Sequence, residues 1–280
     1  MVRKKKFSVS RFLVRVYLAI FSAGIILPVF WTIYTAFKTT PEFFANPWAL
    51  PSSLQIDNFI RAWTLSSVGD YFLNSLKMTI VVVPLLAILG ATTAYACTRL
   101  QLKVGSAVGT LFRLGIFIPT VLCLVPIFLQ LRDARLLDNH WGLMFLLLAI
   151  NLPFTVFVLC GYFRTMPHEL EEASVIDGCS SFQTFWKVMF PLARPGIATV
   201  TIFNFLSVWN EYVLTRTVIQ SPTKNTLPVG LVNLQATTNS SADWGALFAG
   251  MVIIMIPTLL IYFIFQKYIT SGLTAGALKG

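Results

Sequence analysis

Apolar residues in this chain fall into long, nearly unbroken runs that are separated by short polar segments. A helix that crosses a bilayer needs about 20 mostly apolar residues. Six runs have that length, and they cover residues 12–37, 71–97, 108–131, 141–163, 195–214 and 246–266. The pattern therefore predicts an all-α membrane protein with six transmembrane helices.

The composition supports a lipid environment. Apolar residues make up 56% of the chain and charged residues 11%, with a mean hydropathy of +0.74. Soluble domains carry roughly 25% charged residues, so this chain has too few charges to cover a surface in water. The net charge of +10 then indicates basic loops that fix membrane orientation rather than a nucleic-acid partner.

The distribution of Lys and Arg predicts the orientation. Arg3, Lys4, Lys5 and Lys6 precede the first apolar run, which is too long for the core of a signal peptide. If the N-terminus is cytoplasmic, most of the 21 Lys and Arg residues lie on the cytoplasmic side. We expect a basic cytoplasmic N-terminus (1–11), a six-helix domain (12–266) and a cytoplasmic tail (267–280).

Proline recurs inside the predicted spans. Each one removes a backbone hydrogen bond and bends its helix, which favours a bundle around a cavity, although proline is also generally commoner in membrane helices. The prolines are Pro28, Pro84, Pro119, Pro126, Pro153 and Pro257. The loops on the outer side are too short to form a ligand-binding domain, so we expect another polypeptide to select the solute there.

The segment between the fourth and fifth spans, residues 164–194, has a composition of its own. It contains four of the chain's eleven acids, Glu169, Glu171, Glu172 and Asp177. The pattern predicts two short helices with a stop at Gly178 and a cap at Ser180 or Ser181. The second helix carries an apolar stripe and ends at a proline: Phe182, Phe185, Trp186, Met189 and Pro191. Either the segment is a solvated loop on the membrane surface, or it is a rigid knob that docks into a partner's groove.

The spacing within this segment resembles a known motif. Glu172-Ala173-Ser174, three residues, Gly178, nine residues, Val188, one residue and Phe190-Pro191 are similar to the EAA loop of ABC importer membrane subunits. Ser174, Val188 and Phe190 depart from the family's Ala, Ile and Leu. We call residues 164–194 the EAA segment. The resemblance implies that it couples to an ATPase through Glu169, Glu172, Ala173, Ser174, Asp177, Gly178, Phe182, Phe185 and Pro191.

The resemblance extends over nearly the whole chain, to the shorter permease of maltose-type carbohydrate importers. Asn204-Phe205, the stretch from Trp209 to Tyr212 and the ending 271–280 are similar to that family. It implies a type I importer permease in a bacterial inner membrane, with a second permease, two ATPase subunits, an external sugar-binding protein and a sugar substrate. It also implies that the tail contacts the ATPases through Gly272, Thr274, Gly276 and Lys279.

This chain contains no G-x-x-x-x-G-K-[ST] phosphate loop. We therefore expect a non-catalytic subunit without a cofactor of its own, and ATP and Mg bound by the partner ATPases. Cys97, Cys123, Cys160 and Cys179 lack metal-ligand or disulfide spacing, and three of them fall inside or beside apolar runs, so they are expected to be small buried residues.

Polar residues inside a membrane are costly and are functional by default. Asn151, Asn204, Asn210 and Glu211 fall in predicted spans, where they could bond sugar hydroxyls while nearby aromatic side chains stack on the ring. The predicted pathway adds Phe205, Trp209 and Tyr212, with Gln130 as a further candidate. A purely structural pairing, such as Glu211 with Arg216, is the alternative.

Two other function classes fit less well. A secondary transporter driven by protons or sodium needs ionisable groups deep in the bundle, and Glu211 is the one candidate acid. A membrane-embedded enzyme would need a catalytic cluster. The two histidines, His140 and His168, fall in predicted loops on opposite sides, so neither a metal site nor a nucleophile with its base can be assembled from them.

Overall fold

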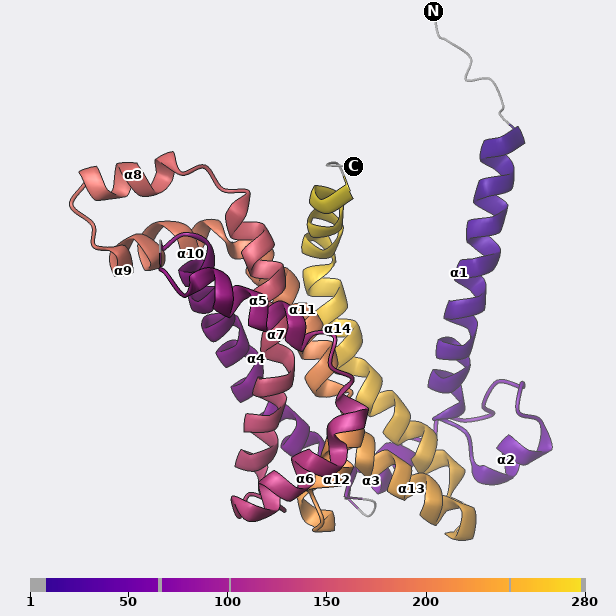
Figure 1. The fold of residues 1–280 in the computed structure, drawn as a ribbon. Helices are drawn as coiled ribbons and strands as arrows, with labels where there is room; N and C mark the ends of the chain where they lie inside the picture. The colour runs from indigo at the N-terminus through magenta and orange to yellow at the C-terminus, as the bar shows by residue number, and fades with distance from the viewer. Residues whose placement is uncertain (1–8, 65–66, 101, 242, 278–280) are drawn as a thin grey trace, which may run out of the picture. The chain divides into compact units, whose positions relative to one another are not determined.

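A computed structural model of the chain describes residues 9–64, 67–100, 102–241 and 243–277 (Figure 1). For residues 9–11, 237–241 and 267–277 it describes the backbone alone. Within these residues the chain consists of helices and connecting loops, as the apolar pattern predicts.

Four helices are long and apolar enough to cross a membrane without interruption. They are α1 (Val9–Thr35), α4 (Val68–Thr98), α7 (His140–Arg164) and α14 (Trp244–Ala277), with apolar spans over Phe12–Thr35, Val68–Thr98, His140–Arg164 and Trp244–Gln266. Two bent pairs, Gly105–Gly115 with Thr120–Asp133 and Ser181–Leu192 with Arg194–Trp209, bring the number of candidate spans among the described residues up to six. The predicted six-helix architecture therefore matches the structure, although two spans are not single helices.

The third predicted span is sharply bent. Helix α5 (Gly105–Gly115) and the pair η1 (Thr120–Cys123) and α6 (Leu124–Asp133) meet at 92°. Pro119 lies at the break in an extended conformation, with ψ of 112°. Because proline lacks an N–H and disfavours helical geometry in the residue before it, the chain turns here instead of continuing as one helix.

The apolar pattern predicts one continuous helix over residues 195–214, the fifth span. The structure has a break within it. Helix α11 (Arg194–Trp209) ends before α12 (Val213–Val218) begins. Asn210 Nδ2 donates to the carbonyl oxygen of Leu206 at 2.9 Å, and a Glu211 carboxylate oxygen accepts from the backbone N–H of Leu214 at 2.6 Å. The Glu211 carboxylate thereby satisfies an N–H in the first turn of α12, which has no partner within that helix, and hydropathy alone does not reveal this break.

The chain forms two compact units, of which the first contains residues 1–68 and 233–253. It includes α1, α2 (Thr40–Ala45) and α3 (Asp57–Thr64). The buried Asn58 amide donates to the carbonyl oxygens of Ala36 and Lys38, each at 2.8 Å, and Arg61 forms an ion pair with Asp243 at 3.0 Å. The most apolar stretch of α1 buries none of its side chains within the chain.

The second unit contains residues 69–232 and 254–280. Its core packs α4, α7 and α11 together with the EAA segment, which comprises α8 (Glu169–Ile176), α9 (Ser181–Thr184), the π-helical turn η2 (Phe185–Met189) and α10 (Phe190–Leu192). Helices α4 and α7 approach closely at Gly90, where a Cβ atom would collide with Thr155 Cγ2. This unit also contains α5, η1, α6, α12, η3 (Pro222–Lys224), the start of α13 (Leu227–Ser241) and the part of α14 from residue 254 onward.

A polar network closes the end of this unit that lies opposite the EAA segment. The Asp138 carboxylate, just before α7, accepts from Lys224 Nζ at 2.8 Å and from the Ser221 backbone N–H at 2.8 Å. Hydrogen bonds from Lys224 and Ser221 hold the pKa of Asp138 well below its usual range. The loops before α7 and after α12 are thereby tied together.

Candidate functional site

Helix α8 presents an acidic and apolar outer surface. Glu169, Glu172 and Ala173 are exposed, and the acids occupy the first turn, where they complement the positive end of the helix dipole. Val175 and Ile176 are also exposed. These two apolar side chains were not predicted, because they follow no stripe of helical period. The surface combines charge with exposed apolar area, the composition of a docking site.

A tight turn with a fixed backbone conformation follows α8. Gly178 has φ of +77°, in the left-handed region that favours glycine. The Ser180 hydroxyl then accepts from the Gln183 backbone N–H, and the Gln183 side chain accepts from the Ser180 backbone N–H, a complete capping box at the start of α9. The predicted helix stop at Gly178 is confirmed, and of the two candidate caps the structure has Ser180. Asp177 and Gly178 are both exposed.

The apolar stripe of the second helix is divided between the permease core and the outer surface. Phe185 is 4% exposed and Met189 is fully buried, in one cluster with Tyr95 and Phe163. Phe182, one turn earlier, is 73% exposed. The prediction that Phe185 belongs to an outward docking face is therefore wrong. The π-helical turn over Phe185–Met189 adds a residue to the turn, and Pro191, half-buried, lies in α10 directly after it.

Ser174, the departure from the family's EAA pattern, has a structural reason. Its hydroxyl lies 2.7 Å from Thr184 Oγ1, and both side chains are buried. An alanine at either position would leave the other hydroxyl without this partner. The pair joins α8 to α9 across the turn, so Ser174 serves the internal geometry of the segment. A hydroxyl at a position that is apolar in the family was the available sequence signal for such a contact.

Arg99 connects α8 to the end of α4. Its Nη2 donates to the Met166 carbonyl oxygen at 2.6 Å, and its Nε lies 3.6 Å from a Glu171 carboxylate oxygen. The His168 ring lies 3.0 Å from Arg99 Nη1. The Arg99 side chain is 2% exposed, so these contacts are largely shielded from water. Arg99 was not predicted as a functional residue, because its contacts join residues about seventy positions apart in the sequence.

Three of the predicted pathway residues are buried within the chain. Asn204 is 1% exposed, and its amide donates to Thr155 Oγ1 at 2.9 Å. Trp209 is equally buried, donates to the Ile254 carbonyl oxygen at 3.2 Å and stacks on Phe205. Because Asn204, Phe205 and Trp209 hold α11 against α7 and α14, the prediction that they contact a solute directly is not supported by their positions.

The remaining pathway candidates lie at or near the break in the fifth span. Asn210 and Tyr212 are exposed and Glu211 is half-buried. Asn151 is half-buried and accepts from the Ser207 hydroxyl at 2.7 Å, and Gln130 is exposed on α6. Among the described residues Glu211 bonds to the backbone of Leu214 and forms no ion pair with Arg216. The structure thus brings Asn210, Glu211 and Tyr212 together at an irregular piece of backbone.

The predicted tail contacts lie at the end of α14. The backbone at Gly272, Thr274 and Gly276 is helical, but the surroundings of their side chains are outside the description. Lys279 lies outside the described residues.

The comparisons with known proteins agree with this geometry. Residues 85–274 match the family described as "Binding-protein-dependent transport system inner membrane component". The chain also superimposes on a subunit of a bacterial ABC transporter involved in the import of the acidic polysaccharide alginate, with a TM-score of 0.80 and 22% identity, covering 96% of this chain and 98% of the other. This similarity shows the fold of a type I ABC importer permease.

Curated relatives match over nearly their full length. The diacetylchitobiose uptake system permease protein NgcG of Streptomyces coelicolor is 36% identical, covering 94% of this chain and 87% of the relative. DasC of the same organism, with the same printed description, is 33% identical over 92% and 93%. The melibiose/raffinose/stachyose import permease protein MelC of Bacillus subtilis is 30% identical over 94% of both chains. The chain therefore belongs to the family of binding-protein-dependent transport system inner membrane components, the non-catalytic permease subunits of ABC importers.

Proposed function

We propose that this chain forms half of the translocation pathway of an ATP-driven importer of small oligosaccharides. Two relatives are named for the uptake of the disaccharide diacetylchitobiose and one for melibiose, raffinose and stachyose. These names share a substrate class of two to a few sugar units, so diacetylchitobiose and galactosides are the first candidates to test. Within this chain, the exposed face of α8 is the observation that favours a separate ATPase subunit as partner.

The importer would contain this chain, a second permease, two ATPase subunits and an external sugar-binding protein in a bacterial inner membrane. The sequence has no phosphate-binding loop, so ATP and Mg would be bound by the ATPase subunits. The unburied apolar face of α1 would meet lipid or the second permease. With the EAA segment cytoplasmic, both termini would be cytoplasmic, and Gly272, Thr274, Gly276 and Lys279 would extend toward the ATPases.

The contacts of the EAA segment suggest how a push from the ATPases would reach the bundle. Glu169, Glu172, Ala173, Asp177 and Phe182 form the outer surface that an ATPase groove would grip. Load on α8 would pass to α9 through the buried pair of Ser174 and Thr184, and to α4 through Arg99.

From α9 the load would enter the core of the bundle. Phe185 packs against Tyr95 of α4 at 5.2 Å between ring centroids, in the cluster that includes Phe163 of α7. Packed cores transmit displacement because they are dense and resist compression. A rigid shift of α4 and α7 relative to other helices is the form of motion expected for alternating access.

We place solute contact at the break between α11 and α12. Non-helical backbone at membrane depth is tolerated where it is buried in protein or lines a water-filled cavity. Asn210 and Glu211 would bond sugar hydroxyls, and the exposed Tyr212 ring would stack on a sugar face. Asn151 lies close enough to bond Ser207 and would support this site from α7.

Reconstituted complexes test the proposal. The full importer in proteoliposomes should take up labelled diacetylchitobiose or galactosides, and its ATPase should be stimulated by the loaded binding protein. Glu172→Ala should lower uptake and stimulated ATPase activity together, whereas Asn210→Ala should raise the apparent KM for sugar with coupling intact. Uptake that continues without ATP and collapses with an uncoupler would show a secondary transporter instead.

A further inference from the structure

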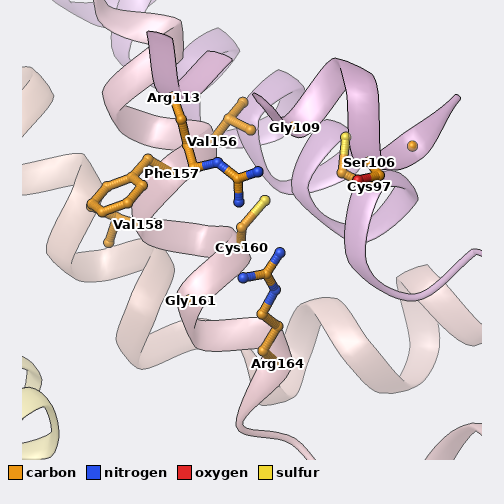
Figure 2. Close-up of a pocket in the computed structure, with 11 residues that line it drawn as sticks. Cys97, Ser106, Gly109, Arg113, Val156, Phe157, Val158, Cys160, Gly161 and Arg164 are labelled. Atoms are coloured by element: carbon orange, nitrogen blue, oxygen red, sulfur yellow. The ribbon is translucent and has the colours of Figure 1, made fainter. Parts of the chain in front are cut away.

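A cavity of about 580 Å³ lies at the end of the bundle that carries the EAA segment. It is formed where the end of α4, the first turns of α5 and the last turns of α7 meet (Figure 2). Residues that line it include Cys97, Gly109, Arg113, Val156, Cys160 and Arg164. None of these is a predicted coupling or solute-pathway residue, so the cavity is separate from both sites described above.

Two arginines share this cavity without a carboxylate between them. Arg113 comes from α5 and Arg164 from the last residue of α7, and Figure 2 shows their guanidinium groups on either side of the Cys160 side chain. Arg113 Nη2 donates to Thr110 Oγ1 at 2.7 Å. Among the described residues, neither guanidinium forms an ion pair. Two neighbouring cations repel each other, and an anion between them would remove that cost and supply charge-assisted hydrogen bonds.

The position of Arg113 along α5 increases the stabilisation that such an anion would provide. It lies eight residues after Gly105, the first residue of α5, which corresponds to about 12 Å along the helix at 1.5 Å per residue. A charged side chain that far along an apolar span is expensive unless it is paired or reaches the membrane surface. Arg164 is the last residue of α7 and is exposed.

The rest of the cavity wall suits a hydrocarbon chain. Val156, Phe157 and Val158 line it, and Phe157 is 49% exposed. A second groove of about 310 Å³ shares Cys97 and Gly105 with the cavity and is lined mainly by apolar groups, including Ala96 of α4, Leu102 of the following loop and Val108 of α5. A paired cation site beside two apolar grooves matches an anionic headgroup with two acyl chains.

We propose that Arg113 and Arg164 bind the phosphate of an anionic phospholipid from the leaflet on the side of the EAA segment. The acyl chains lie along Phe157 and in the groove beside Cys97. Phosphate accepts planar, two-pronged hydrogen bonds from arginine, and basic pockets between helices on the cytoplasmic side hold such headgroups. The lipid then joins α5 to the end of α7, where the EAA segment begins.

Lipid binding to the purified importer tests this assignment. Complexes in neutral detergent are titrated with phosphatidylglycerol, with phosphatidylcholine and with inorganic phosphate, and bound lipid is counted by native mass spectrometry. We expect phosphatidylglycerol to bind, and Arg113→Gln with Arg164→Gln to weaken that binding at least tenfold. The control Arg194→Gln removes an exposed arginine at the same end of the bundle, outside the cavity, and should leave binding within twofold of the parent.

Cys160 supplies a second readout that does not depend on the arginine variants folding. In a complex with Cys97, Cys123 and Cys179 replaced by Ser, phosphatidylglycerol should slow maleimide labelling of Cys160 at least fivefold. Arg113→Lys with Arg164→Lys keeps both charges and should retain part of this protection. Equal protection by inorganic phosphate or phosphatidylcholine would overturn the assignment to an anionic lipid, as would phosphatidylglycerol binding that the double Gln variant leaves unchanged.

Discussion

The two helical pieces of the EAA segment, α8 and the stretch from α9 to α10, differ in how far their side chains are buried against the rest of the chain. In α8 the described side chains are mostly exposed, and Ser174 is the buried one. In the second piece Thr184, Phe185 and Met189 are buried, and they join a core that extends into α4, α7 and α11. We call the exposed helix α8 the presented piece and the stretch from α9 to α10 the anchored piece. Gly178 lies between them.

This difference suggests why the segment can transmit a load. A helix exposed on most of its surface would bend away from a push unless something rigid stood behind it. Phe185 and Met189 provide that support through dense packing, while Ser174 and Arg99 attach α8 to it. Sequence motifs alone mark the exposed acids and the turn, but they do not separate gripped residues from anchoring ones.

The largest effect should come from the anchor. Phe185→Ala removes a ring packed against Tyr95, Trp186 and Phe190 and should cost about 3–5 kcal/mol of stability. Thermal unfolding of the complex in detergent, followed by circular dichroism, measures this loss. A variant as stable as the parent would show that the second piece is not an anchor.

A smaller effect, of a different kind, is expected at the exposed surface. Phe182→Ala should change stability by less than about 0.5 kcal/mol, yet weaken ATPase binding by about 2 kcal/mol if the ring is a central contact. Co-purification with the ATPase and its stimulated activity measure that loss. Comparable losses of stability in Phe182→Ala and Phe185→Ala would remove the distinction between the presented and the anchored piece.

A substitution at Gly178, in the turn after α8, should act through backbone geometry alone. Nothing lies within 4 Å of a Cβ atom built on Gly178, whose φ is +77°, so Gly178→Ala should cost about 1–2 kcal/mol through left-handed strain. Gly24→Ala in α1 is the matched control. The site of Gly24 is equally open, but its backbone is helical, so alanine causes no left-handed strain there. Coupling measured as sugar-stimulated ATPase should fall in Gly178→Ala and stay unchanged in Gly24→Ala.

The smallest effect should come from the hydroxyl pair. Ser174→Ala removes the hydroxyl's bonds to Thr184 Oγ1 and to the Glu171 carbonyl oxygen and should cost about 1 kcal/mol, the low end for two hydrogen bonds, because the second lies within α8. Because both hydroxyls are buried, Ser174→Ala combined with Thr184→Val should cost less than the two single changes added together. Additive costs in this double-mutant cycle would mean that the two hydroxyls do not interact.

Much of the fold could be predicted from the apolar pattern, because span length is set by bilayer thickness. The two broken spans could be predicted only in part. Pro119 marks the bend between α5 and η1 in the sequence, whereas the break at Asn210 depends on side chains that bond the local backbone. Hydropathy counts such residues as small interruptions and cannot show that the helix stops.

The residues of the candidate site also divide into those whose structure depends on the local sequence and those whose structure depends on distant contacts. Gly178 and Ser180 were predictable because turn and cap residues act locally. The burial of Phe185, Asn204 and Trp209 was not, because a helical stripe shows that a face is apolar without showing which neighbour covers it. Arg99 could not be identified either, since its partners in α8 are distant in the sequence.

The central claim is that the exposed face of α8 contacts the ATPase. In a complex whose four native cysteines are replaced by Ser, Ala173→Cys, on the exposed face, and Ser174→Cys, on the buried face, are compared with a short thiol crosslinker to a cysteine in the ATPase groove. The account predicts a crosslink from position 173 whose yield changes with ATP, and essentially none from 174. Crosslinking from both positions alike, or from neither in an active complex, would contradict it.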